Sequence, residues 1–138
     1  FVLVPPEKAG NEKGVYLTQK DVREVQLAKA AIAAGIQLLM KELGITEKEI
    51  QKIYIAGAFG NYMNPASACA IGLLPPELEH LVEPVGNAAG EGAKIALLNT
   101  DELEATDRLV KSIRFLELAA SAEFQDTFVD ELAFPEEE

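Results

Sequence analysis

Two glycine-rich segments of this sequence have residue types that could place a ligand against the polypeptide backbone. The first, residues 57–61 (Gly-Ala-Phe-Gly-Asn), directly follows an apolar run at 53–56. Glycine and alanine put nothing larger than a methyl group beside the backbone, so a flat or charged ligand could approach it closely. The same residues could instead serve only a tight connection between a strand and a helix. The residue types alone weigh these two interpretations equally.

The second segment, residues 86–92 (Gly-Asn-Ala-Ala-Gly-Glu-Gly), could line a ligand or let a helix pack closely on a neighbour. Packing is the simpler interpretation. Neither standard phosphate-binding fingerprint fits, because Glu91 follows Gly90 where a P-loop needs lysine, and neither segment contains GxGxxG.

Lys29 is the one cation in an otherwise small and apolar stretch of a predicted long helix, and Gln26 lies one turn earlier. Such a lysine either extends its ammonium to solvent along its aliphatic stem or meets a polar partner. The residues alone favour extension to solvent.

The other reactive residue types offer little chemistry. His80 is the only histidine, and Cys69, between two alanines, is the only cysteine. A metal centre, an iron–sulfur cluster or a nucleophilic triad needs several such groups, so we predict no metal ligand and no catalytic residue here. Cys69 fits a small buried core residue, and one thiol fits a reducing, cytoplasmic compartment.

Charge excludes some classes of partner. Among the 138 residues, 12 are basic and 23 acidic, and residues 101–138 hold 12 of the acidic groups but only 3 basic ones. We therefore expect neither nucleic acid nor an anionic membrane surface as a partner. We also find no apolar run of the roughly 18 residues that a membrane span needs.

The elements that must position these groups follow from local patterns. Apolar runs predict strands at 1–4, 15–17, 53–56, 81–85 and 113–118, and periodicity predicts helices at 18–44, 64–71, 93–98, 101–112 and 123–132, with a helical turn at 46–51. The alternation predicts one α/β domain over residues 1–138, with a layered, mixed or parallel sheet and helices on both faces. Both glycine segments then follow the carboxyl ends of strands, where α/β proteins bind ligands.

Four segments in series carry a resemblance to a known family. They are LTQKDVREVQLAKAAI (17–32), IAGAFGN (55–61), IGLLP (71–75) and VGNAAG (85–90). In this order and spacing they resemble the C-terminal part of the reductive activators of corrinoid proteins, over about residues 17–134. That family is similar to the actin, sugar-kinase and chaperone ATPases (the ASKHA superfamily), which implies part of an actin-like, ribonuclease H-like lobe.

The resemblance also implies an activity for the whole protein. These activators use ATP, with magnesium, to help return the inactive cob(II)alamin of a methyl-transferring corrinoid protein to cob(I)alamin. The electron enters through an N-terminal iron–sulfur domain. We therefore expect this chain to be a C-terminal lobe fragment, in the cytoplasm, of a longer protein that is a homodimer and has a corrinoid protein as partner. The cluster is expected elsewhere in that protein.

Carried over to this sequence, the resemblance implies nucleotide contacts at Gln26, Lys29, Gly57, Ala58, Phe59, Gly60 and Asn61. Ala58 departs from the superfamily pattern, which has a second glycine there. Gly86, Asn87 and Gly90 resemble a later motif that packs the lobes together or lies beside the nucleotide. The Asp-x-Gly phosphate loops of the superfamily have no counterpart in this sequence. We therefore predict the adenosine side of a site at most, and no ATP hydrolysis by the fragment alone.

Two alternatives stay open. The chain could be a module for dimerisation or for docking a corrinoid protein, with glycine turns that are purely structural. It could also belong to an activator of another low-potential enzyme, such as a dehydratase or a benzoyl-CoA reductase. Those activators carry cluster-binding cysteines within the ATPase lobes, and Cys69 alone does not supply them.

Overall fold

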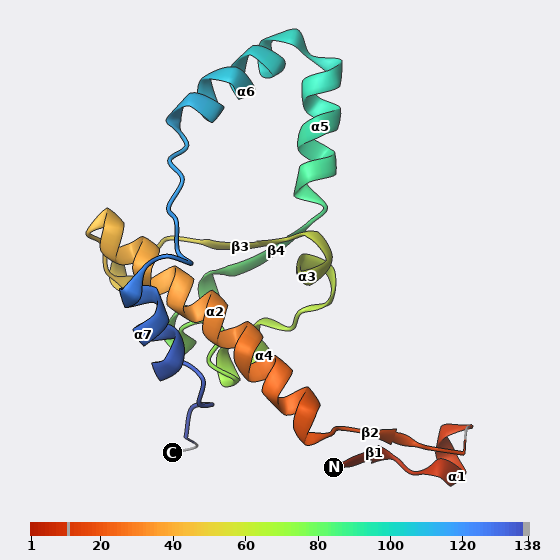
Figure 1. Ribbon diagram of the computed structural model, residues 1–138. Helices are drawn as coiled ribbons and strands as arrows, with labels where there is room; N and C mark the ends of the chain where they lie inside the picture. Colours follow the sequence, from red (N-terminus) through yellow and green to blue (C-terminus); the bar gives the residue numbers. More distant parts are fainter. Residues whose placement is uncertain (11, 137–138) are drawn as a thin grey trace.

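The computed structural model describes residues 1–10 and 12–136, without the side chains of Phe59 and Asn61. The chain begins with a hairpin in which β1 (Val2–Val4) pairs antiparallel with β2 (Val15–Tyr16). A short helix, α1 (Pro6–Ala9), lies in the connection between them. This hairpin projects from one end of the molecule, and its apolar side chains, including Phe1 and Leu3, are exposed (Figure 1).

Helix α2 (Gln19–Leu43) is the long helix predicted between Thr18 and Gly44. It begins with a capping box, in which the Thr18 hydroxyl accepts from the Asp21 N–H and the Asp21 carboxylate accepts from the Thr18 N–H. It ends at Gly44, which adopts the left-handed conformation with φ of 66°. Its buried face is built mostly from small residues, Ala30, Ala33, Ala34 and Gly35 among them, so other segments pack close to its axis.

The central pair of strands is parallel, as predicted. After the 3-10 turn η1 (Glu47–Glu49), β3 (Ile53–Ala56) pairs with β4 (Val82–Gly86). Between them come α3 (Gly57–Tyr62), α4 (Pro65–Ala70) and the 3-10 helix η2 (Pro76–Leu81), and these link the two strands by a crossover. The fold is therefore mixed α/β, with two small sheets and many helices, which confirms the predicted class.

The core lies beneath this strand pair. Ala68, Cys69 and Leu74 are buried together, and Ile53, Ile55 and Val82 pack against them. The Cys69 thiol lies 3.7 Å from the carbonyl oxygen of Pro75, to which it donates. Burial raises the pKa of the Cys69 thiol, and the nearby carboxylates of Glu79 and Glu77 add to this. Cys69 is therefore a core residue with an unreactive thiol, as its alanine neighbours predict.

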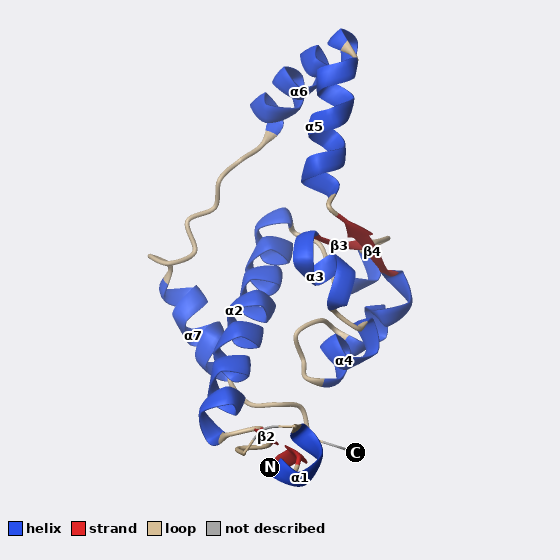
Figure 2. Ribbon diagram, turned by 90° about the vertical axis from the view of Figure 1, so that its right-hand side faces the viewer, coloured by secondary structure: helices blue, strands red, loops and turns tan. Residues whose placement is uncertain are grey.

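Helices α5 (Ala88–Leu98) and α6 (Thr100–Ser112) form a helical hairpin, here called the α5–α6 arm. The arm stands away from α2 and the strand pair in two perpendicular views (Figures 1 and 2). Neither helix has a buried residue, although both carry large apolar side chains such as Leu97 and Val110. In the described part of the chain, no helix is long and apolar enough to cross a membrane.

One predicted strand is wrong. Residues 113–118 are extended but have no strand partner among the described residues, and they return as a connection from the arm to α7 (Ala122–Asp130) (Figure 2). Leu118, at the end of this connection, packs on α2, where a Cβ added to Gly35 would lie 3.6 Å from Leu118 Cδ1. An alternating apolar sequence extends the backbone, but a strand also needs a neighbour for its hydrogen bonds.

Candidate functional site

The two glycine segments meet at one edge of the strand pair. Because β3 and β4 are parallel and Ala56 is paired with Gly86, residues 57–61 and 86–90 leave the sheet side by side. We call them the paired glycine turns. Gly60 closes the junction, since a Cβ added there would lie 2.2 Å from the Ile55 carbonyl oxygen and 3.1 Å from the Gly86 nitrogen. Only glycine fits at this approach of backbone to backbone.

Gly57 has a different property. Its φ is 71°, in the left-handed region, and a Cβ added there would meet nothing within 4 Å. Ala56, Gly57 and Ala58 are all exposed, so the backbone at the start of α3 faces open space. No described residue other than glycine has a positive φ, and Ala58 therefore occupies the second position of the turn without backbone strain. The side chains of Phe59 and Asn61, two further predicted contacts, lie outside the described part of the chain.

The turn after β4 is organised by its own hydrogen bond. Asn87 caps α5, because its Oδ1 accepts from the Gly90 N–H at 3.1 Å. A Cβ added to Gly90 would lie 2.4 Å from Asn87 Nδ2, so Gly90 leaves the room that this cap needs. Gly86 has φ of 60° and turns the chain from strand to helix. Local packing thus accounts for Gly90, while ligand contacts from Gly86 and Asn87 stay a prediction.

The structure pairs Lys29 with a residue that the sequence did not single out. The Lys29 side chain is only 3% exposed, and its Nζ lies 3.3 Å from Glu131 Oε2. The other carboxylate oxygen, Oε1, accepts from Gln37 Nε2 at 2.6 Å. Extension to solvent is therefore the wrong interpretation, and Lys29 has a polar partner 102 residues along the chain. No local pattern could have indicated Glu131. Gln26, one turn before Lys29, is half-buried.

A cavity of about 180 Å³ lies beside this ion pair. Ala33, Ile36, Gln37 and Met40 of α2 line one side of it, and the 72–77 segment lines another. Glu131 completes the wall, and no residue of the paired glycine turns contributes to it. The cavity is smaller than the 300 Å³ or so at which small-molecule sites usually begin, so it is too small for a nucleotide.

The described residues contain no cluster of side chains that could bind a metal ion by themselves. No group of three or more histidine, cysteine, aspartate or glutamate side chains is placed to hold an ion there. The single thiol, Cys69, is buried in the core. The described part of the chain therefore has backbone surfaces for a ligand but no cluster or metal centre of its own.

The described chain is a mixed α/β lobe in which a parallel strand pair ends in two glycine segments. Comparisons with known proteins give its class. A family model, described as the C-terminal domain of RACo, the ASKHA domain, matches residues 1–138, so the chain belongs to that family. This confirms the resemblance seen in the sequence.

Named relatives carry related descriptions. The chain is 40% identical over 129 residues to the corrinoid activation enzyme RamQ of Eubacterium limosum, which covers 94% of this chain and 22% of that protein. It is 29% identical over 136 residues to a Co(II) methylated amine-specific corrinoid protein reductase of Methanosarcina barkeri, covering 97% and 25%. A solved structure of a reductive activator for corrinoid, iron-sulfur protein is similar with a TM-score of 0.86 and 33% identity, covering 98% and 22%. The chain thus spans a quarter or less of each relative.

Proposed function

We propose that this chain is the nucleotide-binding lobe of an ATP-dependent reductive activator, which returns the cob(II)alamin of a corrinoid protein to cob(I)alamin. One observation carries the nucleotide part of the proposal. At the carboxyl end of β3, the backbone of Gly57 faces open space in a conformation that favours glycine. The family match and the names of the relatives support the corrinoid part.

The residues present fit one side of an ATP site. The open backbone at Gly57 and Ala58 leaves room for a flat adenosine group, and Gly86 and Asn87 lie beside that turn across the strand pair. ATP would supply the driving force for electron transfer to the corrinoid. The sequence has one cysteine and so does not fit an iron–sulfur cluster, and the described residues hold no group of three or more side chains that would bind magnesium without the nucleotide phosphates. We assign those groups to other parts of the whole protein.

Nucleotide titration tests the proposal. Ala58→Leu adds bulk beside the opening at an exposed position without backbone strain, so the affinity for ADP and ATP should fall by about tenfold or more, which corresponds to roughly 1.4 kcal/mol. Gly57→Val should abolish binding. Because it also strains the left-handed backbone at this position, a loss there is less specific to the nucleotide. Gly92→Ala, in α5 with nothing within 4 Å of the added carbon, is the matched control and should bind normally.

Two results would contradict the proposal. One is an affinity of Ala58→Leu equal to that of the unaltered protein, which would put the nucleotide elsewhere. The other is ATP turnover by the 138-residue chain itself, which we expect to be absent because no Asp-x-Gly loop is present to hold phosphates.

A second candidate function is a docking or dimerisation module that binds no nucleotide. The exposed apolar residues of the α5–α6 arm favour it, since surfaces of this kind usually meet a partner. Association through the arm that is the same with and without ADP, together with no measurable nucleotide binding, would select this candidate.

A further inference from the structure

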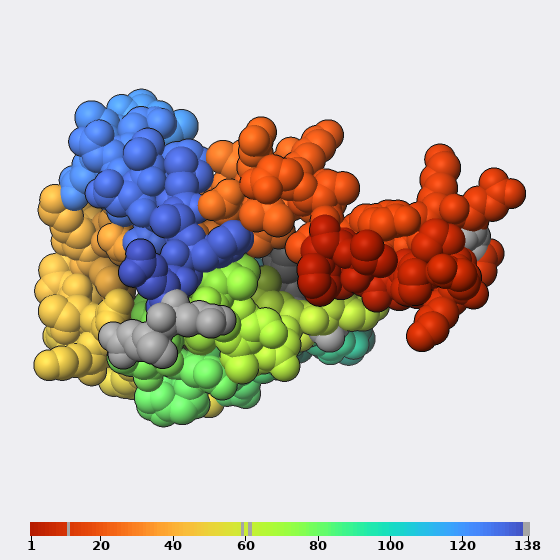
Figure 3. Space-filling model, turned by 90° about the horizontal axis from the view of Figure 1, so that it is seen from below, coloured from red at the N-terminus to blue at the C-terminus, as the bar shows by residue number. Residues whose placement is uncertain are grey.

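Helix α7 is attached to α2 by complementary charge. Residues 115–138 contain no basic side chain, whereas the facing side of α2 presents Lys29 and Lys41. The two helices lie against each other along one side of the molecule (Figure 3). Lys41 pairs with Glu123 at the start of α7, and Lys29 pairs with Glu131 directly after its end. One ion pair therefore holds each end of the helix.

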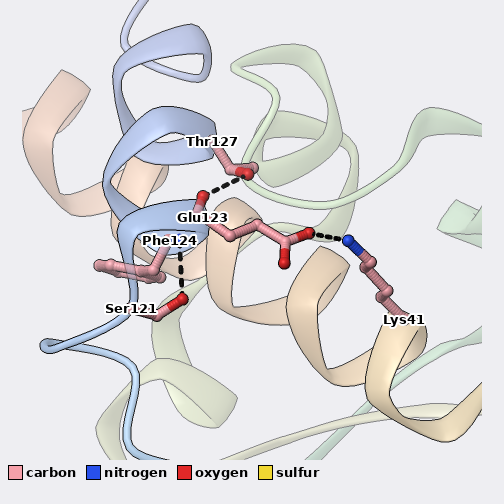
Figure 4. Close-up of polar contacts among 5 residues, drawn as sticks. All are labelled: Lys41, Ser121, Glu123, Phe124 and Thr127. Carbon is pink, nitrogen blue, oxygen red and sulfur yellow. Dashed lines mark hydrogen bonds and ion pairs between the residues drawn. The ribbon is translucent and has the colours of Figure 1, made fainter.

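The two ion pairs differ in burial. The Lys41–Glu123 pair is open to solvent, with side chains 68% and 50% exposed, next to the Ser121 cap of α7 (Figure 4). The Lys29 side chain is almost fully buried, and that of Glu131 is 26% exposed. Surface pairs of the first kind contribute little to stability, whereas a buried charge without a partner is strongly unfavourable.

The surroundings of Lys29 leave its ammonium little room for anything else. A Cβ added to Gly72 would lie 3.2 Å from Lys29 Nζ and 3.0 Å from Pro135 Cγ. Gly72, in the loop after α4, therefore lies against both the Lys29 ammonium and the C-terminal segment. Glu131 uses one carboxylate oxygen for Lys29 and the other for Gln37.

We propose that Lys29, Gln37 and Glu131 form a clamp, with Lys29 at its buried end, that fastens α7 to α2, and that Lys29 serves this clamp rather than an anionic ligand. The clamp stands on contacts within the chain and is independent of the nucleotide proposal. It reassigns the residue that the family resemblance places among the nucleotide contacts. Gln26 is not part of the clamp.

Because Lys29 is more deeply buried than Glu131, the two substitutions that break their ion pair should differ in cost. Removing the Glu131 charge leaves a buried ammonium without compensation. Removing the Lys29 charge leaves a carboxylate that reaches solvent and keeps its hydrogen bond from Gln37. Glu131→Gln should therefore release α7 more than Lys29→Met does, and the double variant should regain part of the loss.

Hydrogen–deuterium exchange of the α7 amides in the intact protein tests the clamp. Glu131→Gln should speed exchange of residues 122–130 about 100-fold, in line with a broken buried pair. Glu123→Gln breaks the exposed pair on the same two helices and is the matched control, with an expected change below about fivefold. Lys29→Met/Glu131→Gln should exchange at least about tenfold more slowly than Glu131→Gln alone.

The clamp is overturned if Glu131→Gln exchanges like Glu123→Gln, or if the double variant gains nothing. Should Glu131→Gln fail to fold, the double variant is compared with Lys29→Met, and the two should agree within about fivefold because no buried cation is left to neutralise. A nucleotide titration separates the two proposals. Lys29→Met should bind ADP like the unaltered protein, and a tenfold loss with unchanged α7 exchange would make Lys29 a ligand contact. Absence of nucleotide binding in the unaltered protein would refute the proposed function and leave the clamp standing.

Discussion

Gly57 and Gly60 lie three residues apart and need glycine for different reasons. At Gly57 the requirement is conformational, because φ is 71° while the space for a side chain is empty. At Gly60 the requirement is steric, because the Ile55 carbonyl oxygen occupies the place of a side chain. The first glycine leaves the turn open, and the second brings it against β4.

Alanine at each position separates the two requirements. Gly57→Ala should lower the free energy of unfolding by about 1–2 kcal/mol, the cost of a left-handed conformation for a residue with a Cβ. Gly60→Ala should cost more and disturb the β3–α3 junction, because backbone has to move. Gly92→Ala should be neutral or stabilise by about 0.5–1 kcal/mol in the helix interior. Urea unfolding measures all three, and equal losses at Gly57 and Gly92 would contradict the conformational requirement.

For single residues, the sequence predicts the glycine position at Gly57 but not the ion-pair partner of Lys29. Glycine residues after an apolar run are a local signal, and that signal indicates where the chain leaves each strand, at Gly57 and Gly86. It does not indicate that residues 57–62 continue as helix α3. Glu131 is 102 residues from Lys29, so only the packing of α7 on α2 brings the two together. The sequence therefore indicates that Lys29 needs explanation but specifies no partner for it.

Helix α2 shows what a capping box contributes at the scale of an element. The hydroxyl and the N–H of Thr18 both hydrogen-bond the Asp21 carboxylate, at 2.6 and 2.7 Å, and these bonds lower the pKa of Asp21. Thr46 and Glu49 repeat the arrangement at η1, where the pKa of Glu49 is lowered for the same reason. The ionised carboxylate is the stronger acceptor in each box.

The first turn of α2 should consequently respond to acid. A carboxyl with a lowered pKa in the folded state stabilises above its unfolded pKa, about 3.9 for aspartate, and this contribution is lost as the pH falls through the lower folded value. We expect the Thr18 amide resonance in NMR spectra to titrate at a pH below about 3.9. In Asp21→Asn this titration should disappear, whereas Asp21→Asn titrating like the unaltered chain would exclude the box as its cause.

Most elements with local signals agree with the sequence, and three differences are instructive. Residues 57–62 form helix α3 where the glycines predict a turn, α5 begins at Ala88 rather than at residue 93, and residues 113–118 form no strand. Thr18, Asp21 and Gly44 locate both ends of α2, and Asn64 followed by proline locates the start of α4. Residues 113–118 have the alternation of a strand, but no edge lies beside them in the described chain. Helix ends depend on residues a few positions away, whereas a strand depends on a partner that no local pattern specifies.

The whole molecule has more surface than a compact protein of its size. Its accessible surface is 10529 Å², against roughly 7,000 Å² expected for a compact monomer of this mass. The α5–α6 arm and the N-terminal hairpin account for much of the exposed apolar area, with Leu97 85% and Leu98 84% exposed. The chain spans a quarter or less of its named relatives, and in proteins of that length such apolar surfaces would be available to contact other parts of the protein.

Substitutions on the arm test whether these surfaces act between molecules. Leu97→Gln/Leu98→Gln should change the free energy of unfolding of this chain by less than about 0.5 kcal/mol per residue, because neither side chain packs in the described structure. The same variant should weaken self-association of the chain in sedimentation experiments. A large loss of stability would instead mean that both leucines pack against this chain itself.

The connection at 113–118 constrains how the arm can move. It joins the C-terminal end of α6 to α7, while β4 holds the N-terminal end of α5. The arm is therefore anchored to the rest of the molecule at two points rather than at one hinge. Nine residues, 113–121, separate α6 from α7, and fully extended they reach at most about 30 Å, which sets the limit of any excursion. A displacement of the arm that fully extends this connection would pull on α7, and a protease that cuts once within 113–118 would uncouple the two.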